Sequence, residues 1–234
     1  NSARACSNLG NTYFKNKQYE AAIQMYKKSL TLPYSYPFIH FNLGATYEKV
    51  GLVDKAIEEY KASISRNNDN TLAFNNLGTV YDKQGLYDLA IEAYTNALTN
   101  NPYFPLTHNN LGNTYEHIGN SEKAMAEYTA ALKIDTNYAD AHNNLGAMYL
   151  KKGILDKAID ELKKAAQLKP EHLDAHYNLG IAYAMKGLYA DAMDEMNLAI
   201  KYNANDYAAY RDLGLLYFKY KKDAQKSLYY LNES

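Results

Sequence analysis

A short motif, Asn-Leu-Gly or Asp-Leu-Gly, recurs along this chain at a fixed interval of 34 residues. Its glycines are Gly10, Gly44, Gly78, Gly112, Gly146, Gly180 and Gly214. A single pair of helices of this length cannot bury its own apolar side, so a chain that repeats the unit seven times must stack the copies around a continuous core. The period therefore predicts an all-helical solenoid.

Other residues repeat in the same register. A tyrosine follows each glycine by three residues, and an alanine follows each of the first six glycines by twelve residues, from Ala22 to Ala192. Glycine and alanine so placed allow two antiparallel helices to approach closely. Four residues after each alanine comes a large side chain that can fill the space between units: Tyr26, Tyr60, Tyr94, Tyr128, Leu162 and Met196.

This pattern resembles the tetratricopeptide repeat, whose outline is W-x2-L-G-x2-Y, then A-x3-F, then P. The resemblance covers nearly the whole chain and implies an all-α, right-handed superhelical solenoid of antiparallel helix pairs, forming one domain over residues 1–234. In the last repeat, Ala224 and Leu228 are expected to hold the alanine and the large position, two residues early, which implies a shorter loop. The repeats run over residues 3–36, 37–70, 71–104, 105–138, 139–172 and 173–206, with a shortened seventh over 207–234.

The turn inside each repeat carries its own signal. Glycine falls midway through repeats two to six, from Gly51 to Gly187, where a left-handed residue can end the first helix. The first repeat has Asn16-Lys17 there instead, and Asn is expected to take the left-handed conformation because it tolerates it next best.

Composition excludes several classes of protein. The formal net charge of −1 offers no general attraction to nucleic acid, and no run of eighteen apolar residues exists to span a membrane. The start at Asn1 suggests a piece of a longer chain, in which a targeting peptide would be invisible. A soluble protein is therefore expected. The single cysteine excludes an intramolecular disulfide but does not determine the cellular compartment, so the cytoplasm is only slightly favoured.

Catalysis and metal binding find little support. Four histidines share the position that the family gives to Trp, but equivalent points on neighbouring repeats lie roughly 10 Å apart, and zinc needs all its donors about 2 Å from one centre. The favoured interpretation is that these histidines fill the space that Trp usually occupies in the family. No phosphate-binding loop, CxxC pair or nucleophile elbow is present, so we expect no enzyme, cofactor or metal. The residues at the Trp position are Cys6, His40, Phe74, His108, His142, His176 and Tyr210.

RNA recognition is a second alternative, since helical repeats of similar length can read RNA one base at a time. Such a surface should be basic, and this chain is balanced in charge. Protein or extended-peptide binding, with no nucleic acid and no membrane insertion, is therefore the favoured function.

The family resemblance implies a concave groove lined by positions 2, 5, 6, 9, 12 and 13 of each first helix, counting Ala3 as position 1. Asparagine offers a donor and an acceptor, so it can hold the backbone of an extended peptide of any sequence. The asparagines of the expected groove are Asn8, Asn42, Asn76, Asn110, Asn144 and Asn178 at position 6, Asn75, Asn109 and Asn143 at position 5, and Asn11 and Asn113 at position 9.

This series resembles the asparagine ladder in the repeat arm of O-linked N-acetylglucosamine transferases. An alternative stays open, because asparagine at position 6 is common in the family and can simply bond the neighbouring helix. Asparagine at position 5 argues more strongly for binding, since this poor helix former gains nothing from an exposed site within a helix.

Position 5 also argues against one family mode, the clamp for the carboxyl tails of chaperones. That clamp needs a lysine at position 5, and no repeat of this chain has one there. The two ends of the groove are apolar, which suits a ligand with hydrophobic anchors. Phe14, Phe38 and Phe41 lie toward the first end, and Tyr177, Ile181, Met185, Leu215 and Phe218 lie toward the last.

The favoured function is a protein-interaction scaffold that binds a peptide or protein segment in this groove, and the alternative is the substrate-recruiting arm of a larger enzyme. The last helix has apolar groups on more than one side, at Tyr229, Tyr230 and Leu231. Such a patch is usually covered. We therefore expect either a capping helix after Ser234 or self-association through this carboxyl-terminal helix.

Overall fold

The computed structural model describes residues 2–33, 38–67 and 70–233 of the chain. Within these ranges it contains fourteen α-helices, one short π-helix and no β-strand. The expected start of the second repeat, residue 37, lies outside the described residues. The chain packs as two compact units, the N-terminal half, Asn1–Gly119, and the C-terminal half, Asn120–Ser234.

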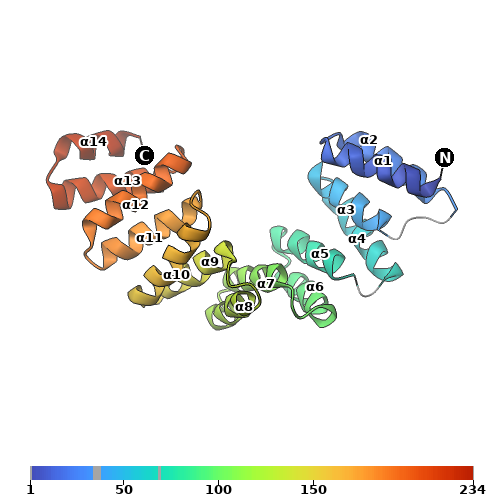
Figure 1. The fold of residues 1–234 in the computed structure, drawn as a ribbon, viewed down its shortest axis with the longest axis horizontal. Coiled ribbons are helices and arrows are strands. Elements are labelled where there is room, and N and C mark those ends of the chain that lie inside the picture. The colour runs from blue at the N-terminus through green and yellow to red at the C-terminus, as the bar shows by residue number, and fades with distance from the viewer. Residues whose placement is uncertain (1, 34–37, 68–69, 234) are drawn as a thin grey trace. The chain divides into compact units, whose positions relative to one another are not determined.

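In the N-terminal half, each helix packs against the next one in the chain, and first helices of successive repeats also touch, as α1 touches α3 and α5 touches α7 (Figure 1). Its helices are α1 (Ala3–Lys15), α2 (Tyr19–Leu30), α3 (Ile39–Lys49), α4 (Val53–Arg66), α5 (Thr71–Lys83), α6 (Tyr87–Asn100) and α7 (Pro105–His117).

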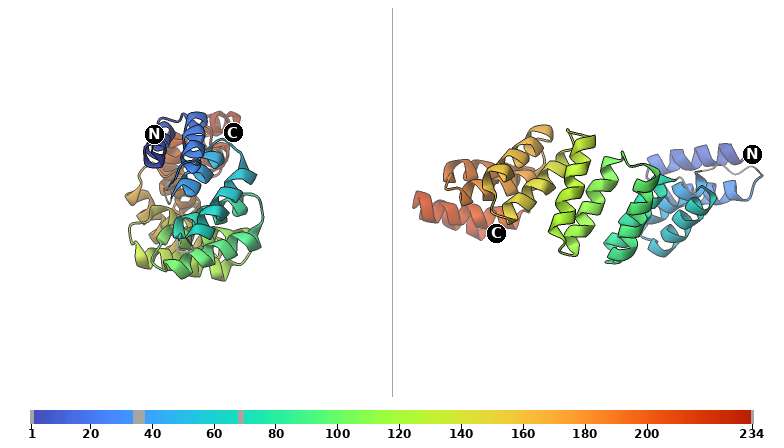
Figure 2. Two further views of the ribbon diagram at one scale, coloured as in Figure 1. Left: turned by 90° about the vertical axis from the view of Figure 1, so that its right-hand side faces the viewer. Right: turned by 90° about the horizontal axis from the view of Figure 1, so that it is seen from below.

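The C-terminal half repeats this order, from yellow-green to red in Figure 2. In this half α9 also touches α11. Its helices are α8 (Ser121–Ile134), α9 (Ala139–Lys151), α10 (Leu155–Leu168), α11 (Leu173–Met185), α12 (Tyr189–Tyr202), α13 (Tyr207–Leu216) and α14 (Ala224–Asn232), with the π-helix η1 (Tyr217–Lys221) following α13. The predicted all-α fold of consecutively packed helix pairs is confirmed. A single continuous solenoid stays a prediction.

The recurring glycine marks the place where the two helices of a repeat meet. A Cβ atom added to Gly10 would lie 2.6 Å from Cε1 of Tyr26, and one added to Gly146 would lie 2.7 Å from Cγ of Leu162. These distances are too short for any side chain larger than hydrogen. The large side chain four residues after the alanine is therefore held against the glycine of its own repeat, and it is buried in all six repeats.

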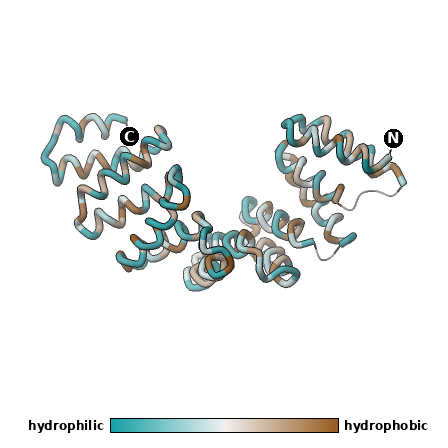
Figure 3. Tube along the Cα trace, viewed as in Figure 1, coloured by the Kyte–Doolittle hydropathy of each residue, from teal (hydrophilic) through white to brown (hydrophobic). Residues whose placement is uncertain are grey.

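The core of each half is built from the same positions. Apolar residues form short stretches separated by polar ones along most helices, so most helices have one apolar side to bury (Figure 3). Leu43, Tyr47 and Tyr60 belong to the core of the N-terminal half, and Leu179 and Met196 belong to that of the C-terminal half. Burying one such side chain contributes about 1.5–3 kcal/mol.

The turns of repeats two to six follow the prediction, because the glycine from Gly51 to Gly187 has φ between 71° and 82°. In the first repeat the expectation was wrong about which residue turns. Lys17 takes the left-handed conformation with φ of 59°, whereas Asn16 has φ of −82°. Lys17 stands seven residues after Gly10, which is the spacing of the turn glycines in the other repeats, so the register overrides the preference of Asn.

The predicted register of the seventh repeat is also wrong. A Cβ atom on Gly214 would lie 2.9 Å from Cγ of Leu231 and 3.2 Å from the backbone oxygen of Ser227, so these two residues hold the positions expected for Leu228 and Ala224. Ser227 is buried and Leu228 is 62 % exposed. The physical reason is that this repeat has one extra residue before the turn. The wider π-helix η1 accommodates that residue, and Lys222, with φ of 53°, ends η1.

We expect Lys17→Gly to stabilise the protein by roughly 0.5–1 kcal/mol. The left-handed conformation costs a residue that has a Cβ atom about 1–2 kcal/mol, and the larger backbone entropy that glycine loses on folding offsets part of this gain. Urea unfolding measures the change. The reverse substitution, Gly51→Lys, should destabilise by a similar amount. A Lys17→Gly protein that is less stable than the wild type would contradict the assignment of this turn.

Candidate functional site

The histidines at the Trp position join the two helices of a repeat. Nδ1 of His142 lies 2.5 Å from Oε2 of Glu161, and Nδ1 of His176 lies 2.6 Å from Oε2 of Glu195. His40 pairs with Glu59 in the same way at 2.6 Å. Each pair connects a first helix to the second helix of its own repeat.

In His142 and His176 the other ring nitrogen binds the turn that precedes the repeat. Nε2 of His176 lies 2.8 Å from the carbonyl oxygen of Pro170, and Nε2 of His142 lies 3.0 Å from that of Thr136. Carboxylate and carbonyl oxygens only accept hydrogen bonds, so both ring nitrogens of His176 are held as donors, which favours its imidazolium form. The hydrogen bond to Glu195 raises the pKa of His176, while burial of the ring acts in the opposite direction.

The histidines therefore act as packed, hydrogen-bonded side chains, in line with the favoured reading of the sequence. Within the described ranges, no group of three or more His, Cys, Asp or Glu side chains could hold a metal ion. No described helix is long and apolar enough to cross a bilayer.

Asparagines at position 6 reach back toward the preceding repeat. Nδ2 of Asn42 donates to Oδ1 of Asn11 at 3.0 Å, and Nδ2 of Asn76 donates to the hydroxyl of Tyr60 at 3.3 Å. In the C-terminal half, Nδ2 of Asn178 donates to Oδ1 of Asn143 at 3.0 Å. The alternative that the sequence left open is therefore correct in part, since Asn42 and Asn178 connect first helices and Asn76 connects its first helix to the second helix of the preceding repeat. A side-chain amide can make up to four hydrogen bonds, so capacity for a ligand remains.

Asparagines at position 5 were expected at an exposed site, and the structure corrects this. Asn75, Asn109 and Asn143 are only 3 %, 5 % and 7 % exposed. Oδ1 of Asn75 accepts from Oγ1 of Thr107 at 2.9 Å and from Nδ2 of Asn110 at 3.3 Å. Position 5 lies where one first helix meets the next, so its side chain joins repeats and presents little surface to a ligand.

The remaining predicted residues differ in exposure. Asn8 is exposed, and Asn113, Asn144 and Tyr177 are half-buried. Nδ2 of Asn143 donates to Oδ1 of Asn144 at 3.2 Å. The Tyr177 hydroxyl donates to Oδ2 of Asp212 at 2.9 Å, and burial together with this carboxylate raises the pKa of Tyr177 to about 12.

One pocket brings together several of the predicted residues. It has a volume of about 280 Å³ and lies in the N-terminal half between the first helices α1 and α3, with Tyr26 of α2 at its base. Phe14, Phe41 and Ala45 supply its apolar wall, and Asn11 and Asn42 supply its amides. Lys15 completes the lining. Phe38, which the sequence placed at the same end, is exposed and does not line this pocket.

A second pocket of about 450 Å³ lies in the C-terminal half, where α11 and α13 expose apolar side chains. Three of the residues predicted at this end, Ile181, Leu215 and Phe218, line it together with Asp212 and Lys219. Met185 is exposed at the end of α11 and does not line the pocket. Both apolar ends predicted from the sequence thus have a pocket, each within its own half.

Positions 12 and 13 form a further set of contacts that the sequence reasoning missed. Nζ of Lys83 donates to Oε1 of Glu48 at 2.8 Å, and Nδ1 of His117 lies 3.1 Å from Oδ1 of Asp82. Each pair joins a position 12 residue to the position 13 residue of the next repeat. An acidic residue at position 12 followed by a basic residue at position 13 is the feature of the sequence that could have predicted these contacts.

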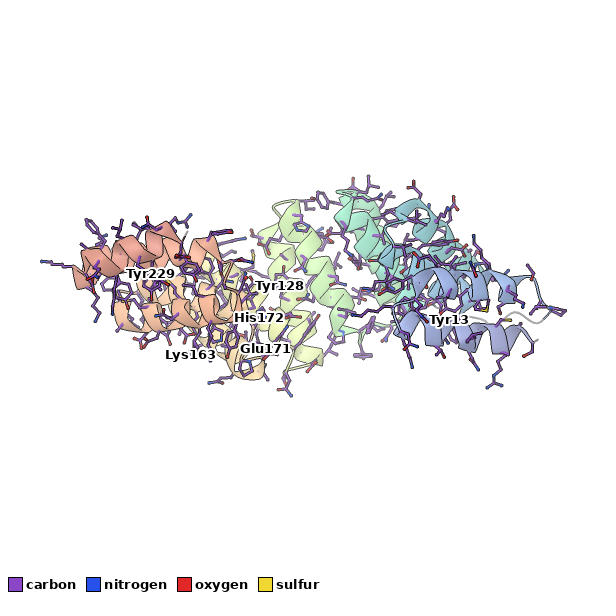
Figure 4. All side chains as sticks on the ribbon, turned by 90° about the horizontal axis from the view of Figure 1, so that it is seen from above. Tyr13, Tyr128, Lys163, Glu171, His172 and Tyr229 are labelled. Carbon is purple, nitrogen blue, oxygen red and sulfur yellow. The ribbon has the colours of Figure 1, made fainter. Side chains whose placement is uncertain are left out.

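The face of α14 that was expected to be apolar is exposed at Tyr229 and at Leu231, and Figure 4 labels Tyr229 on this helix. Tyr230 is half-buried, and its ring stacks on that of Tyr217 with centroids 5.4 Å apart. Self-association through this helix stays a prediction.

Sequence profiles of known families match most of the chain. Profiles described as TPR repeat match residues 7–51, 117–153 and 146–187, and profiles described as Tetratricopeptide repeat match residues 39–70, 71–104 and 93–126. The chain belongs to the tetratricopeptide repeat family. A comparison with curated proteins finds no match.

Solved structures of tetratricopeptide repeat proteins resemble this one. A chain of the APC/C hetero-tetramer Cut9–Hcn1 matches with a TM-score of 0.79 and 21 % identity, over 92 % of this chain and 43 % of that one. YrrB, described as a TPR protein with an unusual peptide-binding site, matches with a TM-score of 0.61 and 21 % identity, over 79 % of this chain and 95 % of its own. A structure of MamA matches with a TM-score of 0.61 and 28 % identity, over 71 % of this chain and 97 % of its own.

We expect Asn75→Ala to destabilise the protein by about 1–3 kcal/mol, because it leaves the buried hydroxyl of Thr107 without its acceptor. Removing both partners in Asn75→Ala with Thr107→Val should restore part of that loss. Urea unfolding of the single and double variants measures this coupling. Asn8→Ala, at an exposed site, is the control and should change stability by less than about 0.5 kcal/mol. Additive losses in the double variant would contradict the coupling.

We expect the stability that His176 contributes to fall as pH rises. Its pKa is raised in the folded protein, so this contribution is complete below the unfolded pKa of about 6.5 and is lost as pH passes through the folded pKa. Urea unfolding of wild type and His176→Gln at about pH 5.5 and about pH 8.5 should therefore show the larger difference at the lower pH. Glu195→Gln should remove most of this pH dependence, and an equal difference at both pH values would contradict the assignment.

Proposed function

We propose that this tetratricopeptide repeat protein is an interaction scaffold that binds a protein segment through its first helices, and that the pocket between α1 and α3 receives one side chain of that segment. The observation that carries the proposal is the lining of this pocket. Its amides come from Asn11 and Asn42 and its aromatic wall comes from Phe14 and Phe41, on adjoining repeats. A few polar groups around an apolar concavity are typical of a binding site.

The pocket can bind one side chain and hold the backbone beside it. Rings of Phe14 and Phe41 offer apolar surface, and removing a large side chain from water contributes about 1.5–3 kcal/mol. The amide of Asn42 donates one hydrogen to Asn11 and keeps a second N–H and its carbonyl oxygen for a peptide backbone. This combination supports an apolar anchor flanked by backbone hydrogen bonds.

The similar solved structures agree with such a role without identifying the partner. The structure of YrrB is described as having an unusual peptide-binding site, and the Cut9–Hcn1 structure is an assembly of protein chains. A substrate-recruiting arm of a larger enzyme would use the same pocket, and the full-length gene would distinguish the two roles.

The test fills the pocket without removing a core contact. Ala45 lines the pocket, and Ala45→Phe should occupy it. Random linear peptides selected on the immobilised wild-type protein should bind Ala45→Phe roughly 10–100-fold more weakly, which corresponds to one buried side chain. Calorimetry of the enriched peptides measures the loss.

The matched control is Ala126→Phe, which adds the same ring at an exposed site on α8. It should bind the peptides like the wild type. Peptides that bind Ala45→Phe as well as the wild type would show that the pocket is not the binding site.

A further inference from the structure

Positive charge is concentrated in the first repeat. Residues 3–36 carry one acidic residue, Glu20, against five basic ones, whereas the whole chain has a net charge of −1. The basic residues are Arg4, Lys15, Lys17, Lys27 and Lys28. The balanced charge of the chain therefore hides one strongly basic repeat, and this repeat supplies half of the pocket between α1 and α3.

The ion pairs on the first helices leave the cation at this pocket unneutralised. Lys83 and His117, at position 13, each pair with an acidic residue of the preceding repeat. Lys15 and Lys49 hold the same position on α1 and α3, and neither has an ion-pair or hydrogen-bond partner within the described part of the chain. Lys15 lines the pocket, so its ammonium group is available to a ligand there.

Hydrogen bonds inside the pocket also leave mostly donors. Oδ1 of Asn11 accepts from the Tyr26 hydroxyl at 2.7 Å and from Nδ2 of Asn42 at 3.0 Å. The carbonyl of Asn11 is therefore occupied, and its two N–H groups remain. Lys15 adds three donors and no acceptor, while Asn42 keeps one N–H and its carbonyl oxygen.

We propose, on the basis of the function proposed above, that this pocket selects an acidic segment of a partner protein. A large apolar side chain enters between Phe14 and Phe41, and a neighbouring Asp or Glu carboxylate accepts hydrogen bonds from Lys15 and from the amide of Asn11. Charge-assisted hydrogen bonds of this kind are stronger than neutral ones, and the surrounding positive charge speeds association with an acidic partner.

The test uses random linear peptides displayed on phage and selected on the wild-type protein at physiological salt. We expect enrichment of peptides in which Asp or Glu lies beside an aromatic residue or leucine. An enriched peptide is then synthesised with a free and with an amidated carboxyl end. Equal binding of the two forms is expected, because a side-chain carboxylate is the proposed contact. A requirement for the free end would overturn this assignment.

Two charge reversals separate a local contact from a general effect of charge. Lys15→Glu should weaken binding roughly tenfold or more, and it should recover affinity when the acidic residue of the peptide is replaced by Lys. Lys28→Glu is the matched control, because Lys28 also stands in the last turn of its helix and does not line the pocket. It should change affinity less than about threefold, since exposed charges outside the contact contribute little.

The remaining outcomes distinguish this inference from the function on which it rests. Selected peptides that Ala45→Phe blocks, but that show no preference for acidic residues, would overturn the inference and leave the binding function standing. Equal losses in Lys15→Glu and Lys28→Glu would overturn it in favour of diffuse attraction. Failure of Ala45→Phe to block any selected peptide would overturn the function itself.

Discussion

The contact between a glycine on the first helix and a large side chain on the second helix is the constraint on which the rest of each repeat depends. Because Gly10 has no side chain, the ring of Tyr26 can lie directly against the backbone of α1. The same contact recurs with Leu162 at Gly146 and with Leu231 at Gly214. This contact sets the distance between the two helices of a repeat. It therefore also determines which side of the first helix is left to pack against the next repeat.

The side chains on that remaining side serve two purposes, and burial separates them. Asn75 is interior and joins its helix to Thr107 of the next first helix, whereas Asn42 is half-buried and keeps part of its amide for other contacts. An identical residue type can therefore stabilise the array at one position and offer hydrogen bonds at the neighbouring one. Asparagine suits both, because its amide has two donors and one acceptor oxygen.

The first repeat differs from the others in ways that favour recognition. Its turn is made by a lysine in place of glycine, its groove residue Lys15 has no partner within the described ranges, and its aromatic residue Phe14 borders a pocket. In the third repeat the position 13 cation neutralises the acid of the repeat before it, since Lys83 pairs with Glu48. Lys15 therefore differs from Lys83 in having no acidic partner among the described residues and from Lys49 in lining a pocket.

The sequence by itself determined the helix pairs, the family and the place of most turns, because period, glycine and alanine act through local geometry that a one-dimensional pattern records. It also assigned Asn11, Asn42 and Phe41 to one expected groove, and one pocket contains all three. Only the tertiary structure decided that Asn75, Asn109 and Asn143 are interior, because burial at position 5 depends on how closely the next first helix approaches. The last repeat gives the same lesson, since Ser227 and Leu231 replace the predicted Ala224 and Leu228 once η1 absorbs an extra residue. A register inside a bulged helix is fixed by which side chain fits against Gly214, and that is a matter of packing in three dimensions.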